Sequence, residues 1–391
     1  MRIHGVAVWR PLTKEGLSLR TPSGFALKRF SRRLSESWRS SSKGFLTRIG
    51  LSWENYGYLN ARLRGRWEQF YEEEFFDRMA EASLDDVEQA LLSSFYSLHY
   101  RRELATSDAS TLDRIEVALI SGSSERFRWV VSLADGEPFD LMWPLCVRSD
   151  VFNGRALLRK YDGNNFSNMP PRWHDYGMLS SSFFHDLWVD CDRIVDVLER
   201  CYNVENPVVQ ALFEAFLILR QNGSVPRAER AYLSGLLDRC REVLDRSGQG
   251  ARMVSEFLGR MVDLWNLHIW FRRDIDTSDC PVAYLDGGAW LSTKSLMEES
   301  SIEKLLRGTP WGDLQLVEGS LPPELGRLLQ EKFVRWQLEQ RTYDPLSIGM
   351  AIAYMARQMV EWRNLNILAV GLASGLEADK IRSLFFRGGK M

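Results

Sequence analysis

Apolar residues that recur every three or four positions are the feature that most constrains this fold. This spacing runs through nearly all of the chain after residue 50 and places the apolar residues on one face of a helix. Strand-like alternation is scarce, and residues 128–132 fit either a short strand or the start of a helix. We therefore expect an all-α protein. Two clear helical sets are Leu187, Cys191, Ile194, Leu198 and Cys201, and Ile348, Ile352, Met355 and Met359.

Capping residues mark where some of these helices begin and end. Asn206 followed by Pro207 predicts a helix start, because an Asn side chain accepts from free amides and proline fits the first turn. Asn222-Gly223 predicts its end, and Pro226 the beginning of the next helix. Asp344-Pro345 predicts the start of the helix that contains Ile348.

A short polar motif recurs along the chain: an acid, two further residues, an asparagine and then Leu or Phe. A degenerate copy around Asn60 lacks the acid, and the asparagines follow one another at intervals of 105, 101 and 98 residues. Such a regular interval favours the interpretation that the motif is a structural element used once in each repeat. The motif residues are Asn60, Asp162, Asn165, Asp263, Asn266, Glu361 and Asn364.

Each acid and asparagine share one helix face, because they lie three residues apart. A polar pair in an apolar helix is costly unless both groups are bonded. We expect each pair to bind backbone or arginine groups of a neighbouring helix, with Arg62, Arg64, Arg272 and Arg273 as candidates. The alternative is a set of metal ligands or catalytic acids. A second recurring mark, a helix that ends in an aromatic residue, follows at Tyr96, Tyr202 and Trp311.

The charge of the chain is unevenly distributed. Among 391 residues, 50 Lys and Arg nearly balance 52 Asp and Glu, which argues against a uniformly basic nucleic-acid-binding protein. Residues 1–50 nevertheless hold eleven basic residues against Glu15 and Glu36, a net charge of +9 that leaves −11 on the remainder. This segment is an amphipathic helix on anionic lipid, a disordered basic arm, or the product of an upstream start codon.

Motifs for chemistry are weak in this sequence. It contains no phosphate-binding loop, dinucleotide fingerprint or nucleophile elbow, so we expect no cofactor and no metal. His185 near Asp186 and Asp190 is a possible metal face, but a solvated helix surface explains it better. The 14 tryptophans suggest core packing rather than a carbohydrate groove. Without CxxC spacing, we expect reduced and mostly buried thiols at Cys146, Cys191, Cys201, Cys240 and Cys280.

Several tracts, in their order and spacing, resemble the C subunit of the V/A-type ATPases (ATP synthases), whose eukaryotic equivalent is the d subunit of the V-ATPase. The resemblance covers roughly residues 55 to 385, and residues 1–54 precede the usual start of that family. Pro170-Pro171 departs from the family, where a regular helix usually continues. The tracts are Tyr58-Leu59-Asn60-Ala61-Arg62-Leu63-Arg64, residues 262–267, Leu306-Arg307-Gly308-Thr309-Pro310-Trp311, residues 345–349 and residues 360–368.

The resemblance implies an all-helical funnel of three similar bundles around a pseudo-threefold axis. The expected organisation is a basic extension over 1–54 and helical repeats over 55–159, 160–260 and 261–391. The implied role is a non-catalytic central-stalk subunit that links the rotating shaft to the membrane rotor ring. It would lie peripherally on the cytoplasmic face of the membrane, with ring and shaft subunits as partners. The other hypotheses are an α-helical scaffold of another repeat family and a tryptophan-rich enzyme acting on glycans.

Overall fold

The fold was analysed in a computed structural model, which describes residues 56–162, 170–248, 250–271, 284–313, 322–344 and 346–387. Side chains are described for these residues except 322, 323 and 343. Residues 1–54, which include the segment 1–50 with its net charge of +9, lie outside this part, as do Asn165, Arg272, Arg273 and Cys280. The chain divides into two compact units at Leu51, and the following description concerns the second, Ser52–Met391.

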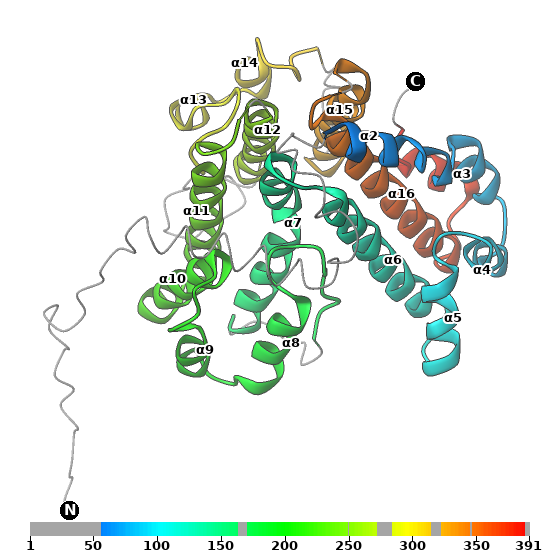
Figure 1. Ribbon diagram of the computed structural model, residues 1–391, viewed down its shortest axis with the longest axis horizontal. Helices are drawn as coiled ribbons and strands as arrows, with labels where there is room; N and C mark the ends of the chain where they lie inside the picture. The colour runs from blue at the N-terminus through cyan, green and yellow to red at the C-terminus, as the bar shows by residue number, and fades with distance from the viewer. Residues whose placement is uncertain are drawn as a thin grey trace, which may run out of the picture. The chain divides into compact units, whose positions relative to one another are not determined.

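Every regular element in the described residues is a helix, which confirms the all-α prediction (Figure 1). The short elements of the first part are α2 (Tyr56–Arg64), the 3-10 turn η1 (Trp67–Gln69), α3 (Glu73–Met79), α4 (Leu84–Leu92) and α5 (Ser97–Thr106). Later short or medium helices are α8 (Ser181–Asp190), α9 (Ile194–Cys201), α10 (Pro207–Asn222), α13 (Thr293–Glu298), α14 (Ile302–Leu306) and α17 (Ala378–Leu384).

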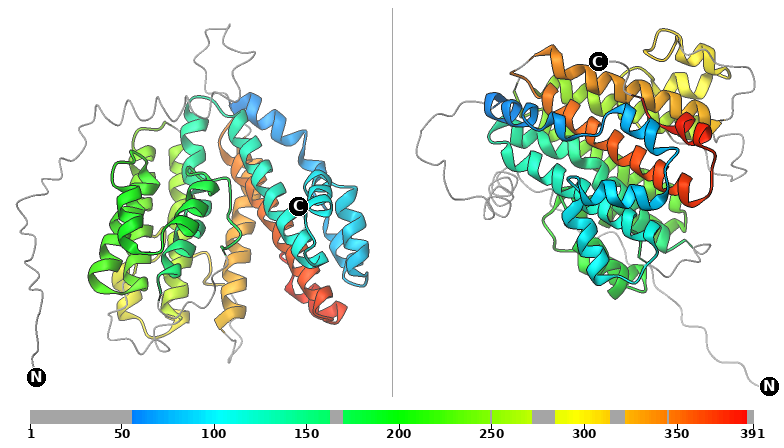
Figure 2. Two further views of the ribbon diagram at one scale, coloured as in Figure 1. Left: turned by 90° about the horizontal axis from the view of Figure 1, so that it is seen from below. Right: turned by 90° about the vertical axis from the view of Figure 1, so that its right-hand side faces the viewer.

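Six long helices follow one another in three consecutive pairs. They are α6 (Thr111–Leu133) with α7 (Glu137–Lys160), α11 (Val225–Leu244) with α12 (Ala251–Trp270), and α15 (Pro322–Tyr343) with α16 (Gly349–Ala373). The second helix of each pair packs on a group of helices elsewhere in the chain: α7 on α8, α10 and α11, α12 on α15, and α16 on α3, α4 and α6. Figure 2 shows α16, near the C-terminus, running beside the N-terminal helices.

One apolar core contains residues from both the N-terminal and the C-terminal helices of this unit. Leu365 and Leu368 of α16 and Ile381 of α17 are buried together with Val87 of α4 and Ile115 of α6. Residues more than 200 positions apart thus share one apolar cluster, and the C-terminal helices complete the core of the first helices of this unit.

The sequence signals located some helix ends well and others poorly. The Asn206 side chain accepts from Val208 and Val209, Gly223 adopts a φ of 63°, and α11 begins at Val225, all in agreement with the capping signals. Residues 128–132 belong to α6, so the strand alternative is wrong.

Two helix predictions need correction. The set from Leu187 to Cys201 forms two helices, because the Cys191 carbonyl accepts from Lys160 and from the Tyr161 hydroxyl rather than from a following amide. Asp344 does not start α16. Its carboxylate accepts from the Leu346 amide in the turn after α15, and the helix begins at Gly349.

Candidate functional site

The α12 pair, Asp263 and Asn266, is completely buried and holds the backbone of the loop before α13. The Asn266 side chain donates to the Leu285 carbonyl (2.8 Å) and accepts from the Leu285 amide (2.7 Å). The Asp263 carboxylate accepts from the amides of Trp290 (2.9 Å) and Leu291 (3.2 Å). The observed partners of this pair are backbone amides and a carbonyl, not arginines.

A second pair with the same contacts lies on α7 and consists of Asp150 and Asn153. Asn153 donates to the His174 carbonyl (2.7 Å) and accepts from its amide (3.0 Å). Asp150 accepts from the amides of Met178 (2.9 Å) and Leu179 (3.2 Å). This α7 pair holds residues 170–180, which form a loop without helix after Pro170-Pro171.

Both loops bring a glycine against the buried carboxylate. A Cβ atom on Gly177 would lie 2.3 Å from Asp150 Oδ1, and one on Gly288 would lie 2.0 Å from Asp263 Oδ1. Both distances are far below a van der Waals contact, so only glycine permits this approach. In each loop a serine, Ser180 or Ser292, then caps the next helix with its side chain. The two loops are therefore built alike.

Burial affects both carboxyl groups; Asp150 has no charged partner, whereas the charge of Arg260 slightly favours ionised Asp263. Burial raises the pKa of Asp150 to about 7 and that of Asp263 to about 6, although the hydrogen bonds from the loop amides partly oppose this shift. Burial and the positive charge of Arg148 lower the pKa of the His174 imidazole to about 4.

The α16 pair, Glu361 and Asn364, repeats only half of this arrangement. Asn364 donates to the Phe386 carbonyl (3.0 Å) and accepts from its amide (2.8 Å), as in the other two pairs. Glu361 instead accepts from groups in the N-terminal part of this unit: the Tyr71 amide (2.7 Å), the Tyr96 hydroxyl (3.0 Å) and Arg126 (2.9 Å). This pair joins the N-terminal and C-terminal parts of the unit.

Arg126 is as buried as Glu361, with exposed fractions of 1% and 2%. Its guanidinium lies 4.4 Å from the ring centroid of Phe70 and 4.1 Å from that of Phe95, and it also donates to Gln358 (2.6 Å). Gln358 in turn donates to Tyr96 and Ser123. The buried ion pair thus belongs to a hydrogen-bonded network around the middle of α6.

Three of the four predicted motif copies have described asparagines. Asn60 of α2 is buried and donates to the Ser347 carbonyl (2.9 Å), a partner unlike those of the other asparagines. Asp162 follows the end of α7 and is half-buried, while Asn165 lies outside the described residues. Arg62 and Arg64 are exposed. Sequence reasoning missed Asp150, Asn153 and Arg126, although Asp150 and Asn153 have the motif spacing of an acid, two residues and an asparagine.

The aromatic residues of the second recurring mark have three different environments. Tyr96 is fully buried against Glu361, Trp311 is buried and donates to the Leu329 carbonyl (3.3 Å), and Tyr202 is 59% exposed. The described tryptophans differ in burial: four, including Trp143, Trp188 and Trp270, are buried, Trp290 is 48% exposed, and the others are half-buried. The described cysteines are free and buried, as expected.

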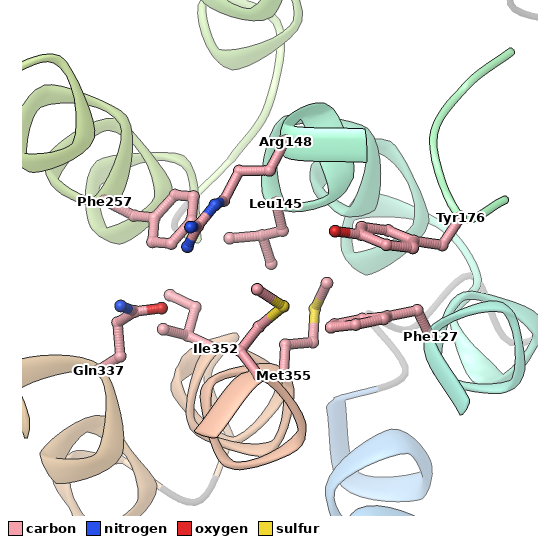
Figure 3. A pocket seen from close by; sticks show the side chains of 9 residues that line it. Phe127, Leu145, Arg148, Tyr176, Phe257, Gln337, Ile352 and Met355 are labelled. Atoms are coloured by element: carbon pink, nitrogen blue, oxygen red, sulfur yellow. The ribbon is translucent and has the colours of Figure 1, made fainter. Parts of the chain in front are cut away.

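Side chains from all three pair-bearing helices meet around one hollow (Figure 3). Most of its lining side chains are buried, and the cavity between them is about 20 Å³, room for about one water molecule. Its walls are apolar or aromatic except for Arg148 and Gln337. They come from α6, α7, α12, α15, α16 and the loop that the α7 pair holds: Phe127, Leu145, Arg148, Tyr176, Phe257, Gln337, Ile352, Met355 and Met359.

Metal-binding clusters and membrane-spanning helices are absent from the residues that the structure describes. No three His, Cys, Asp or Glu side chains gather there in a way that would hold a metal ion. His185, Asp186 and Asp190 are all exposed on α8. No described helix is both long and apolar enough to cross a bilayer.

These features define an all-helical protein in which buried acid–asparagine pairs fix loops and join the chain ends. Comparison with known proteins identifies the family to which the chain belongs. The chain belongs to the ATP synthase (C/AC39) subunit family, whose model matches residues 59–384. This family is a non-catalytic subunit of the rotary ATPase, so neither the scaffold of another repeat family nor the glycan enzyme is retained.

Individual relatives are distant but match over nearly their whole length. The C subunit of an A-type ATP synthase from Haloquadratum walsbyi is 22% identical over 86% of this chain and 100% of its own. The corresponding protein of Methanococcoides burtonii is 23% identical over 87% of this chain and 96% of its own. The C subunit of a V-type ATP synthase from Thermus thermophilus is 24% identical over 84% of this chain and 97% of its own.

Proposed function

We propose that this protein is the central-stalk subunit that couples the rotating shaft of a V/A-type ATPase to its membrane rotor ring. Its partners are the shaft subunits on one side and the ring subunits on the other. It lies peripherally at the cytoplasmic face of the membrane and transmits torque during ion-translocation-coupled ATP synthesis or hydrolysis. Three similar helical bundles in a pseudo-threefold funnel are the arrangement we propose for this task.

The observation that carries this proposal is the family match over 59–384, which covers almost every described helix. One feature of the structure supports it. A torque-transmitting part must resist deformation, and the buried pairs tie loops and the N-terminal part of the described unit to long helices.

The proposal is tested by capture of partners from the source organism. The full chain, immobilised through an added tag, should retain both shaft and ring subunits from detergent-solubilised membranes. A Glu361→Gln variant, in which we expect the free energy of unfolding to fall, should retain less of both. Recovery of neither partner by the unaltered chain would overturn the proposal.

A further inference from the structure

Exposed arginines and exposed apolar side chains lie together on and beside α2. Tyr58, Arg62 and Arg64 are exposed on this helix. Leu346, in the turn between α15 and α16, is also exposed and reaches α2, because a Cβ atom on Gly57 would lie 3.9 Å from its Cδ2 atom. Figure 1 shows α2 beside α15 and α16. We define the α2 surface by the exposed side chains and the arginine that follows the helix: Tyr58, Arg62, Arg64, Arg66 and Leu346.

The arginines of the α2 surface have no acidic partner in the part of the chain that the structure describes. No described carboxylate oxygen lies within 4.0 Å of the guanidinium nitrogens of Arg62, Arg64 or Arg66. Arg66 lies instead over the ring of Trp129, 4.0 Å from its centroid. Asp344, the acid nearest to the turn residue in the sequence, already accepts a backbone amide with its carboxylate. The guanidinium groups are therefore available to an anion from outside the unit.

Two tryptophans accompany these arginines. Trp129 of α6 and Trp67 of η1 are half-buried, and the guanidinium of Arg341 lies 4.7 Å from the centroid of the Trp67 ring. Amphipathic rings and long arginine side chains are typical of the boundary between lipid headgroups and hydrocarbon, because their apolar part is buried while the polar tip stays in water. The composition of this region therefore favours a lipid surface over a small polar ligand.

The charge of the chain changes sign directly after this surface. Residues 1–67 hold 14 Lys and Arg against Glu15, Glu36 and Glu54, a net charge of +11 that leaves −13 on residues 68–391. A basic segment of the chain thus leads into the basic α2 surface, with only residues 51–55 between the segment 1–50 and α2. An anionic membrane attracts this part of the chain and repels the remainder, which favours one orientation of the protein on the membrane.

We propose that the α2 surface binds the anionic headgroups of a lipid bilayer directly. The arginines pair with lipid phosphates, and Tyr58 and Leu346 enter the layer of headgroups. This inference goes beyond the proposed function, which requires contact with protein subunits only. Stable attachment to a membrane surface takes two signals, and here charge and exposed apolar side chains supply them together.

Vesicle flotation with the purified full chain tests the proposal. Vesicles that mix phosphatidylcholine with phosphatidylglycerol should bind the protein, vesicles of phosphatidylcholine alone should not, and salt should weaken the binding. Arg62→Gln with Arg64→Gln should weaken it about 30-fold, because each basic residue at an anionic surface contributes about fivefold. The matched control, Arg101→Gln with Arg102→Gln, removes two exposed charges from α5 and should leave the binding nearly unchanged.

A second pair of variants tests the apolar contact. Leu346→Ser removes an apolar side chain that is 66% exposed and should weaken binding to the mixed vesicles about tenfold. Leu98→Ser removes one that is 71% exposed on α5 and should have no effect. Unchanged helical circular dichroism of each variant verifies that it is folded.

Three outcomes would overturn the proposal. One is equal binding, or none, to the two kinds of vesicle. Another is binding to mixed vesicles that the Arg62, Arg64 and Leu346 variants leave unchanged, which would assign it to the segment before α2 alone. The third is that these variants keep vesicle binding but lose capture of shaft or ring subunits, which would assign the surface to a protein partner. The proposed function fails separately, if the unaltered chain captures neither shaft nor ring subunits.

Discussion

The α12 pair and the α16 pair have the same sequence pattern but connect very different parts of the chain. Asp263 and Asn266 bind backbone groups 19 to 28 residues away. Glu361 binds groups 235 to 290 residues away, in α6 and before α3 and α5. One motif thus fixes a local loop in one place and joins distant ends of the chain in another.

The kinds of contact that the acids make differ between the local pairs and the long-range pair. The hydrogen bonds of Asp263 and Asp150 come mainly from backbone amides, and burial raises the pKa of both carboxyl groups. Glu361 has a full counter-charge in Arg126 and a tyrosine hydroxyl as well. Ordering a longer intervening chain costs more entropy, although the cost rises slowly with length. The stronger, charged contacts therefore lie where the two ends of the unit meet.

The largest expected effect comes from breaking the long-range contact. Glu361→Gln leaves Arg126 buried without its counter-charge, and loss of one partner of a buried ion pair costs about 3–5 kcal/mol. We expect the free energy of unfolding, measured by urea denaturation, to fall by this amount. Glu298→Gln removes an exposed acid beside Lys294 and should change it by less than about 0.5 kcal/mol.

A double variant sharpens this test. Replacing both partners, Arg126→Met with Glu361→Leu, leaves no unpaired charge and should recover most of the lost stability. A loss below about 1 kcal/mol in Glu361→Gln alone would show that the ion pair does not hold the chain ends together.

The α12 and α16 pairs also show how much of the structure can be predicted from the sequence. Helical periodicity predicts the fold class, and capping residues predict both ends of α10, because these signals lie within a few residues of one another. The spacing of acid and asparagine selects Asp263 and Asn266 as well as Glu361 and Asn364. The α7 pair was missed because a regular interval of about 100 residues directs attention to Asn165, whereas Asn153 lies 113 residues before Asn266.

A better signal for the α7 pair follows it in the sequence. Gly177 and Leu179-Ser180 occupy the loop that Asp150 binds, as Gly288 and Leu291-Ser292 occupy the loop that Asp263 binds. No comparable signal identifies Arg126 as the partner of Glu361. These residues are 235 positions apart, and only the packing of α16 on α6 brings them together.

A second prediction concerns the α12 pair, which binds a nearby loop. Asn266→Ala leaves the buried amide and carbonyl of Leu285 without partners, which should lower the free energy of unfolding by about 2–4 kcal/mol. Hydrogen exchange should become faster for residues 285–291 and stay unchanged in α3 to α6. Asn366→Ala loses only a bond within its own helix, to Trp362, and should cost less than about 1 kcal/mol. Faster exchange throughout the unit would contradict a local role.

A third prediction uses the missing counter-charge of the α7 pair. Because its pKa rises from 3.8 to about 7 on folding, Asp150 binds its proton more tightly in the folded protein. Its stabilising contribution is therefore complete below about pH 4 and is lost as the pH rises through about 7. Relative to Asp150→Asn, the unaltered protein should gain about 2 kcal/mol between about pH 8 and about pH 5.

His174 does not obscure this measurement. Its pKa is lowered to about 4, so it loses stabilising effect as the pH falls, but it does so in both proteins. Denaturation curves of the two proteins at each pH give the difference directly. A constant difference across this range would contradict a raised pKa at Asp150.

The smallest expected effect tests whether the aromatic residues at the helix ends share a role. Tyr96→Phe removes a hydroxyl that donates to Glu361 (3.0 Å) and accepts from Gln358 (2.9 Å), and we expect a loss of about 1–2 kcal/mol. Tyr202→Phe changes a residue that is 59% exposed and should cost nothing measurable. Denaturation of both variants measures the difference. Equal losses would mean that the recurring aromatic is a common structural element, whereas unequal losses place the role of Tyr96 in the contact that joins the chain ends.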